Sequence, residues 1–200
     1  MTAPSTASPP ATGQPVPVFN PGWGPLSSLP GNPMMWVLIL SELAVFAAFF
    51  ALFAWERARD PQLFNLSQSQ LDPVAGGLNT LVLLTSGLCA ALALEALATS
   101  RARARLWLLL TMALGLVFCV VKVLEYRHKW QAGIFPETNT FFGFYYGLTA
   151  FHFAHIVFGL ALLGLVTWRL STENLETVTA FWHMVDLIWV LLYPLVYLLR

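Results

Sequence analysis

The sequence predicts an all-α integral membrane protein, a bundle of five transmembrane helices. Of its 200 residues, 58% are hydrophobic and only 10% are charged, too few to cover the surface of a water-soluble domain. Each apolar run is long enough to cross a hydrocarbon core of about 30 Å at about 1.5 Å per helical residue. The runs lack strict alternation, which favours helices over membrane strands. The five runs span about 33–55, 78–99, 104–126, 141–168 and 178–199.

The chain divides into two parts. Residues 1–32 are rich in Pro, Ser, Thr and Gly and carry no charged side chain, so they are expected to form a flexible tail. Residues 33–200 are expected to form the transmembrane domain. Its longest connection is 56–77, and the three arginines of 100–105 are expected to lie in a tight basic turn. If that turn dominates the positive-inside rule, the N-terminus is cytoplasmic.

Ionisable side chains inside the apolar runs are the candidate functional residues, because burying such groups in lipid is costly. Glu42 lies about 13 Å into the first run at helical rise. His152 and His155 are three residues apart in the fourth run. His183 and Asp186 repeat this spacing in the fifth, which places each pair on one helix face. We predict that the five residues form a buried polar network or a proton- or lipid-linked site.

A second group of polar residues ends the third run. Lys122 and Glu125 are three residues apart and Tyr126 follows directly. An ion pair beside an aromatic, basic segment is typical of a membrane boundary. The sequence therefore predicts that these three residues anchor the helix at an interface or contact lipid or a neighbouring subunit.

Absent motifs restrict the chemistry. A haem-and-metal core that reduces oxygen or nitric oxide needs about six histidine ligands, and the chain has four histidines. It also lacks a phosphate-binding glycine loop, a nucleophile elbow, a His-Glu-x-x-His motif and a Cys-x-x-Cys-His motif. We therefore assign no catalytic, cofactor-binding or metal-ligating residue, and we predict that the chain is not an enzyme by itself.

Two further classes stay open. Glu42 and Asp186 would suit a small proton-coupled transporter, although the sequence shows no repeat and has only Pro194 well inside a run. The histidines would suit a membrane metal-binding protein, because two imidazoles one helical turn apart can hold a divalent ion. No nucleic-acid partner is expected.

Four motifs stand out along the chain: SELAVF at 41–46, LNTLVLLTSG at 78–87, FHFAHIVFG at 151–159 and FWHMVDLIW at 181–189. In this order and across about 170 residues, they resemble subunit III of the haem–copper oxidase superfamily. The long form of that family has seven helices. This chain resembles the short form, which lacks the first two, so half of the family's lipid cleft would be missing.

The resemblance implies a non-catalytic accessory subunit of a respiratory-chain complex, which supports assembly, stability or sustained turnover. Segments 122–129 and 141–149 look more like NorE, the accessory protein of nitric oxide reductase in denitrification. The expected partner is thus the catalytic subunit of nitric oxide reductase, which would carry the haem and a non-haem metal, while this chain binds no cofactor. The alternative is subunit III of a quinol or cytochrome c oxidase.

The resemblance also assigns residues and a location. Glu42 matches the family's buried carboxylate, which is linked to lipid or to proton uptake. The remaining candidates match polar positions between helices: His152, His155, His183 and Asp186. The implied location is the bacterial inner membrane, with several crossings, lipid contacts and a cytoplasmic N-terminus.

Overall fold

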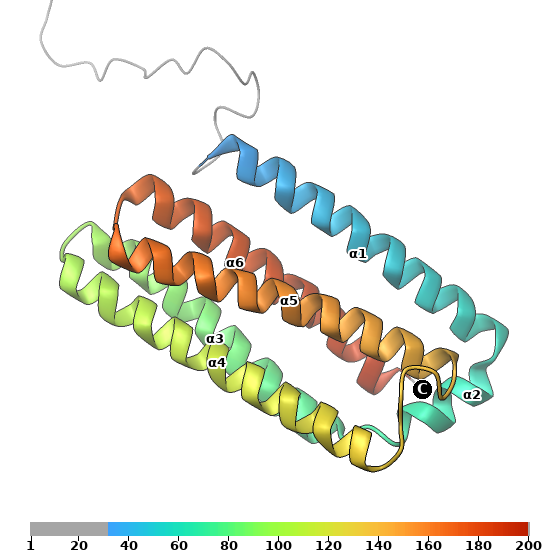
Figure 1. Ribbon diagram of the computed structural model, residues 1–200. Coiled ribbons are helices and arrows are strands. Elements are labelled where there is room, and N and C mark those ends of the chain that lie inside the picture. The colour runs from blue at the N-terminus through green and yellow to red at the C-terminus, as the bar shows by residue number, and fades with distance from the viewer. Residues whose placement is uncertain (1–31, 200) are drawn as a thin grey trace, which may run out of the picture.

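The computed structural model describes residues 32–199, and the expected tail therefore lies almost wholly outside the described residues. All regular structure in this part of the chain is helical (Figure 1). Five helices are long and apolar enough to cross a membrane, which confirms the predicted all-α transmembrane bundle. They are α1 (Pro33–Arg59), α3 (Pro73–Leu97), α4 (Arg101–Gln131), α5 (Thr140–Trp168) and α6 (Thr172–Tyr193).

Each α-helix begins at a capping side chain. Asn, Asp or Ser stands before its first residue and accepts a hydrogen bond from a backbone N–H in the first turn. Proline then occupies the first helical position of three helices, where its missing N–H costs nothing. The caps are Asn32, Asp60, Asp72, Ser100, Asn139 and Ser171. Because caps rather than hydropathy set these starts, α3 and α6 begin several residues before their apolar runs.

Two expected connections differ from the structure. The segment 56–77 is not one loop, since α1 continues to Arg59 and a short helix, α2 (Pro61–Gln68), follows. The predicted basic turn at 100–105 is wrong, because Ser100 caps α4 and the three arginines lie within the first five residues of that helix. The bend between α3 and α4 is therefore confined to the three residues before that helix.

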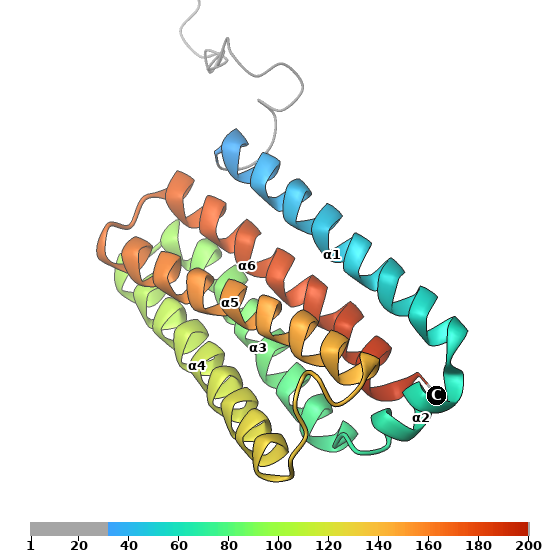
Figure 2. The ribbon, with the colours of Figure 1, turned by 45° about the vertical axis from the view of Figure 1, so that its right-hand side comes forward.

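Helix α6 lies at the centre of the bundle. It packs against α1, α3 and α5, while α3 and α4 pair along one edge and α1 lies at the opposite edge (Figures 1 and 2). Trp182 of α6 is fully buried beside two glycines. A Cβ on Gly159 of α5 would lie 2.8 Å from Trp182 Cε3, and one on Gly115 of α4 would lie 2.9 Å from Trp182 Cη2. Both glycines thus make room for the indole ring.

The C-terminal end of α6 widens into a π-helical segment, η2 (Pro194–Leu198). Proline has no N–H to continue the α-helical ladder. Side chains of α1 and α2 donate hydrogen bonds to carbonyl groups of this segment and of the residue after it. Gln68 Nε2 donates to Val196 O at 2.9 Å, and Arg57 donates to Leu199 O. Helix α2 therefore closes this end of the bundle (Figure 2).

Candidate functional site

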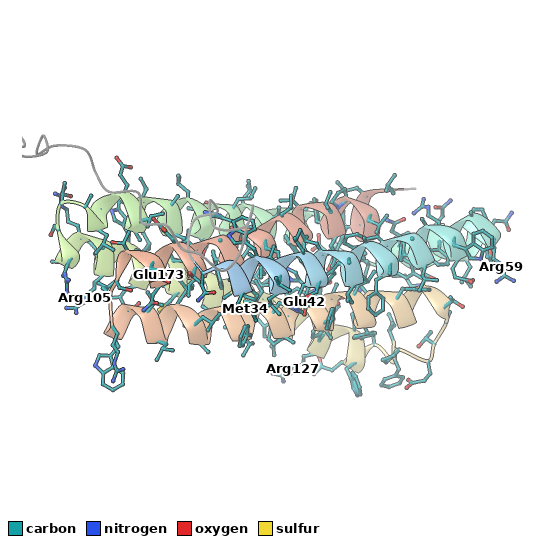
Figure 3. All side chains as sticks on the ribbon, turned by 90° about the horizontal axis from the view of Figure 1, so that it is seen from above. Met34, Glu42, Arg59, Arg105, Arg127 and Glu173 are labelled. Carbon is teal, nitrogen blue, oxygen red and sulfur yellow. The ribbon has the colours of Figure 1, made fainter. Side chains whose placement is uncertain are left out.

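Glu42 and His155 form the first of two polar pairs. Glu42 lies on α1 between Met34 and Arg59 (Figure 3), and its Oε2 is 3.1 Å from His155 Nε2 on α5. His155 Nδ1 is 2.8 Å from Phe151 O. Because a carbonyl can only accept, Nδ1 carries a proton. Nε2 then either accepts a hydrogen bond from a neutral Glu42 carboxyl group or donates one to its carboxylate, so the pair shares one proton between α1 and α5.

His183 and Asp186 form the second pair, both on α6. His183 Nδ1 lies 3.5 Å from Asp186 Oδ2. The aspartate is buried against α3, where a Cβ on Gly87 would come within 2.1 Å of Asp186 Oδ2. The side chain of His183 is instead 46% exposed. Gly87 therefore creates the space for the carboxylate, and the carboxylate orients an imidazole that faces outward.

His152 belongs to neither pair. It is fully buried, its Nε2 donates to Val185 O at 3.1 Å, and its ring packs against Phe118 and Trp189. His152 Nδ1 is buried without a hydrogen-bond partner among the described residues. The five predicted residues are thus arranged as two pairs and one isolated histidine, not as a single network. Their role in proton or lipid chemistry stays a prediction.

A denser polar cluster surrounds Lys122. Its Nζ lies 3.0 Å from Glu125 Oε2 and 2.9 Å from the Tyr197 hydroxyl. Glu125 Oε1 accepts from Tyr145 at 2.6 Å and from Tyr197 at 2.7 Å. The ammonium also lies 5.4 Å from the centre of the Trp189 ring. A buried charge needs such an opposite charge and satisfied hydrogen bonds, so this cluster joins α4, α5 and η2.

Lys122, Glu125 and Tyr126 make their hydrogen bonds inside the bundle, and their predicted role at an interface stays a prediction. Lys122 is 1% exposed, so its side chain does not lie on the surface of this chain. Glu125 points into the bundle, and the Tyr126 hydroxyl donates to Thr149 at 2.8 Å. Tyr145 and Tyr197 were missed by the sequence analysis. The sequence feature that could have identified them is a tyrosine inside an apolar segment, because a buried tyrosine hydroxyl needs a hydrogen-bond partner.

The metal-binding alternative has no geometric support between residues 32 and 199. In this part of the chain, no group of three or more His, Cys, Asp or Glu side chains is placed to hold a metal ion. The two pairs each supply at most one imidazole and one carboxylate.

The family model for cytochrome c oxidase subunit III matches residues 32–200. The chain belongs to this family. The assignment confirms the resemblance that the four motifs indicated, and the matched region contains both polar pairs and the Lys122 cluster. A subunit III chain with five helices able to span a bilayer is a multi-pass membrane protein.

Curated relatives are similar to this subunit III chain over most of its length. Cytochrome c oxidase subunit 3 of Synechocystis sp. is 30% identical over 173 residues, covering 82% of this chain and 73% of the relative. Its Bacillus subtilis counterpart is 30% identical over 177 residues, covering 82% and 84%. Cytochrome bo(3) ubiquinol oxidase subunit 3 of Buchnera aphidicola is 28% identical over 179 residues, covering 82% and 84%. These names refer to oxidases, and none of the three names nitric oxide reductase.

Proposed function

We propose that the chain is a non-catalytic accessory subunit that packs in the membrane against the catalytic subunit of a haem–copper oxidase. The observation that carries the proposal is the match of the subunit III family to residues 32–200. Haem and the second metal belong to the partner subunit in this proposal. The hydrogen bonds of His155 support it, because both nitrogens of that ring are already engaged by protein groups.

An oxygen-reducing oxidase is the better-supported partner. Relatives similar over 82% of this chain are named as subunits of cytochrome c and ubiquinol oxidases. This favours the reading that the sequence analysis held as its alternative. A nitric oxide reductase partner is the second candidate. It is favoured by the likeness of segments 122–129 and 141–149 to NorE, and these segments contribute Lys122, Glu125 and Tyr145 to the buried cluster.

The exposed charges of the chain support a cytoplasmic N-terminus, and the membrane that we propose is the bacterial inner membrane. Lys122 and Lys129 are buried and do not belong to the exposed charge of either membrane face. Within residues 32–199, the exposed arginines at the end where α1 begins are Arg101, Arg103, Arg105 and Arg169. The opposite end exposes Arg59 and Arg127 (Figure 3 labels Arg105 and Arg59 at opposite ends). The excess favours the cytoplasm for the first end.

Purification of the complex tests the function. We would tag the chain, solubilise native membranes in a mild detergent, and analyse the copurified proteins by mass spectrometry and their haems by absorption spectroscopy. Recovery of oxygen-reducing oxidase subunits is the expected result. Recovery of nitric oxide reductase subunits would establish the second candidate. A haem-free chain without either partner, from membranes that contain both enzymes, would overturn the proposal. Untagged membranes provide the background control.

A further inference from the structure

All five tyrosines of the chain lie in one group at the end of the bundle where α4 ends and α5 begins (Figure 1). Each tyrosine ring contacts another, with ring centres 5.0 to 6.3 Å apart. A phenol loses one electron far more readily than the ring of phenylalanine, which would fill nearly the same volume. The grouping therefore concentrates oxidisable rings at one place. The members are Tyr126 of α4, Tyr145 and Tyr146 of α5, Tyr193 of α6 and Tyr197 of η2.

Trp130 connects this tyrosine group to the surface. It is 58% exposed at the end of α4, and its ring centre lies 6.5 Å from that of Tyr146. The ring of Tyr146 in turn lies 5.0 Å from that of Tyr145, which is fully buried. Electron transfer between rings in contact is fast, because electron tunnelling weakens steeply with distance. The three rings therefore form a continuous path for an electron between the interior and the surface.

Tyr145 also has a base for its hydroxyl proton. Loss of an electron makes a phenol strongly acidic, so oxidation of a buried tyrosine needs a proton acceptor within hydrogen-bond reach. The Tyr145 hydroxyl donates to Glu125 Oε1 at 2.6 Å. The Tyr146 hydroxyl donates instead to the backbone carbonyl of Ile134 at 2.9 Å, and an amide carbonyl is a much weaker base than a carboxylate. A radical is therefore stabilised on Tyr145 rather than on Tyr146.

Tyr197 shares the carboxylate but differs at its oxygen. Its hydroxyl donates to Glu125 Oε1 at 2.7 Å, and the same oxygen accepts a hydrogen bond from Lys122 Nζ at 2.9 Å. A positive charge at the oxygen attracts its electrons and makes the loss of one less favourable. Tyr145 is therefore the tyrosine of the group from which an electron and a proton leave together most easily.

We propose that Tyr145 is a radical site, which donates one electron through Tyr146 to an oxidised Trp130 and its hydroxyl proton to Glu125. The oxidant is a high-potential one-electron acceptor, the class to which ferryl haem and oxygen-derived radicals belong. It removes one electron from the exposed indole and leaves an indole radical cation. The electron from Tyr145 restores the neutral indole, while the O–H bond of Tyr145 breaks and the proton binds to Glu125 Oε1. The products are the reduced oxidant, a neutral tyrosyl radical and a protonated Glu125, so electrons and protons balance.

The radical site holds an oxidising equivalent away from the lipid at the surface of the bundle. All its groups belong to this chain: the entry at Trp130, the phenol of Tyr145 and the proton acceptor Glu125. The inference goes beyond the proposed function and needs no partner subunit, so its failure leaves the proposed function intact.

Photochemical oxidation of the full chain in detergent tests the radical site. Photoexcited ruthenium tris-bipyridine, with a pentaamminecobalt complex as its electron acceptor, supplies a one-electron oxidant in solution. Samples are frozen after the flash, and electron paramagnetic resonance identifies the radical, with ring-deuterated tyrosine to distinguish tyrosyl from tryptophanyl signals. We expect a tyrosyl radical in the unaltered chain. A tryptophanyl radical alone would overturn the proposal.

Two variants with matched controls locate the site and its path. Tyr145→Phe should lose most of the tyrosyl signal, whereas Tyr193→Phe should keep it, because the Tyr193 hydroxyl donates only to a backbone carbonyl. Trp130→Phe should also lose most of the signal, whereas Trp168→Phe should keep it. Trp168 is 77% exposed, lies against Arg169 and contacts no tyrosine ring within residues 32–199. SDS unfolding of each variant establishes that it is folded.

Two outcomes for folded variants would overturn the proposal. An unchanged signal in Tyr145→Phe would overturn the site, and equal signals in Trp130→Phe and Trp168→Phe would overturn the path. Because Trp130 lies on the surface, its variant tests the path even if Tyr145→Phe does not fold.

Exchange into heavy water tests the transfer of the proton to Glu125. Because the proton moves with the electron, the tyrosyl radical should form more slowly in heavy water, as measured by transient absorption. The tryptophanyl radical that remains in Tyr145→Phe is the control, since its formation breaks no O–H bond. Equal rates of tyrosyl formation in the two solvents would overturn the role of Glu125.

Discussion

Lys122 Nζ and Glu125 Oε2 lie 3.0 Å apart on successive turns of α4, and the lysine side chain is only 1% exposed. Tyrosines from α5 and η2 complete the hydrogen bonds of both charges. Lys122→Met should therefore lower the free energy of unfolding by about 3–5 kcal/mol, because Glu125 loses its opposite charge while it stays largely buried. Reversible unfolding in SDS measures the change.

The control for Lys122→Met is Arg127→Met, which removes an exposed cation from the same helix and should alter stability by about 0.5 kcal/mol or less. The double variant Lys122→Met, Glu125→Gln should be more stable than Lys122→Met alone. Equal stability of the Lys122 and Arg127 variants would show that the cluster does not hold the helices together.

Gly159 should tolerate no larger residue. In Gly159→Ala the new methyl group would lie 2.8 Å from Trp182 Cε3, so either α5 or the buried indole must shift. We expect a loss of about 1–3 kcal/mol in the free energy of unfolding. Gly147→Ala is the matched control on α5, since a Cβ there meets nothing within 4 Å. If both variants unfold at the same SDS concentration, the result would contradict the close contact between Gly159 of α5 and Trp182 of α6.

Glu42→Gln should preserve the contact between α1 and α5. The amide can donate to His155 Nε2 as a neutral carboxyl group does, whereas Glu42→Leu removes the hydrogen bond and should cost about 0.6–2 kcal/mol. Comparison of the two variants by SDS unfolding separates the hydrogen bond from the proton. If Glu42→Gln retains stability and complex yield but shifts the pH profile of turnover, the shared proton itself has a function.

Gln68→Leu should loosen the end of the bundle that α2 closes. The amide of Gln68 donates to Val196 O from a buried position, so its loss leaves a carbonyl of the π-helical segment unpaired, at a cost of about 1–3 kcal/mol. Amide hydrogen exchange of residues 194–199 should accelerate. Gln62→Leu on the exposed side of α2 is the control and should leave this exchange unchanged. Equal protection in both variants would remove the proposed role of Gln68.

The bundle could be predicted from hydropathy because each long helix must bond its own backbone in lipid. Helix starts were predicted less well. The pairs Asp60-Pro61 and Asp72-Pro73 mark a cap followed by the first helical position, a local signal that an average over an apolar run does not detect. Such signals explain why α2 was missed and why α3 starts before its apolar run.

Spacing along one helix identified contacts within that helix, but not contacts between helices. His183 with Asp186 and Lys122 with Glu125 both follow from a separation of one helical turn. The pairing of Glu42 with His155 depends on the rotation and depth of α1 against α5, which spacing does not determine. The burial of Lys122 also could not be deduced from α4 alone, because Tyr197 reaches it from a segment 75 residues away.

The central position of α6 constrains the biosynthesis of the protein. The ribosome makes α6 after α1, α3 and α5, yet all three pack against it. Until α6 and η2 have been translated, the Trp182 indole that packs against Gly159 is absent. Glu125 also lacks the hydrogen bond from the Tyr197 hydroxyl. These three helices therefore enter the membrane before their common packing partner exists, and a premature stop codon between α5 and α6 would leave all three without it.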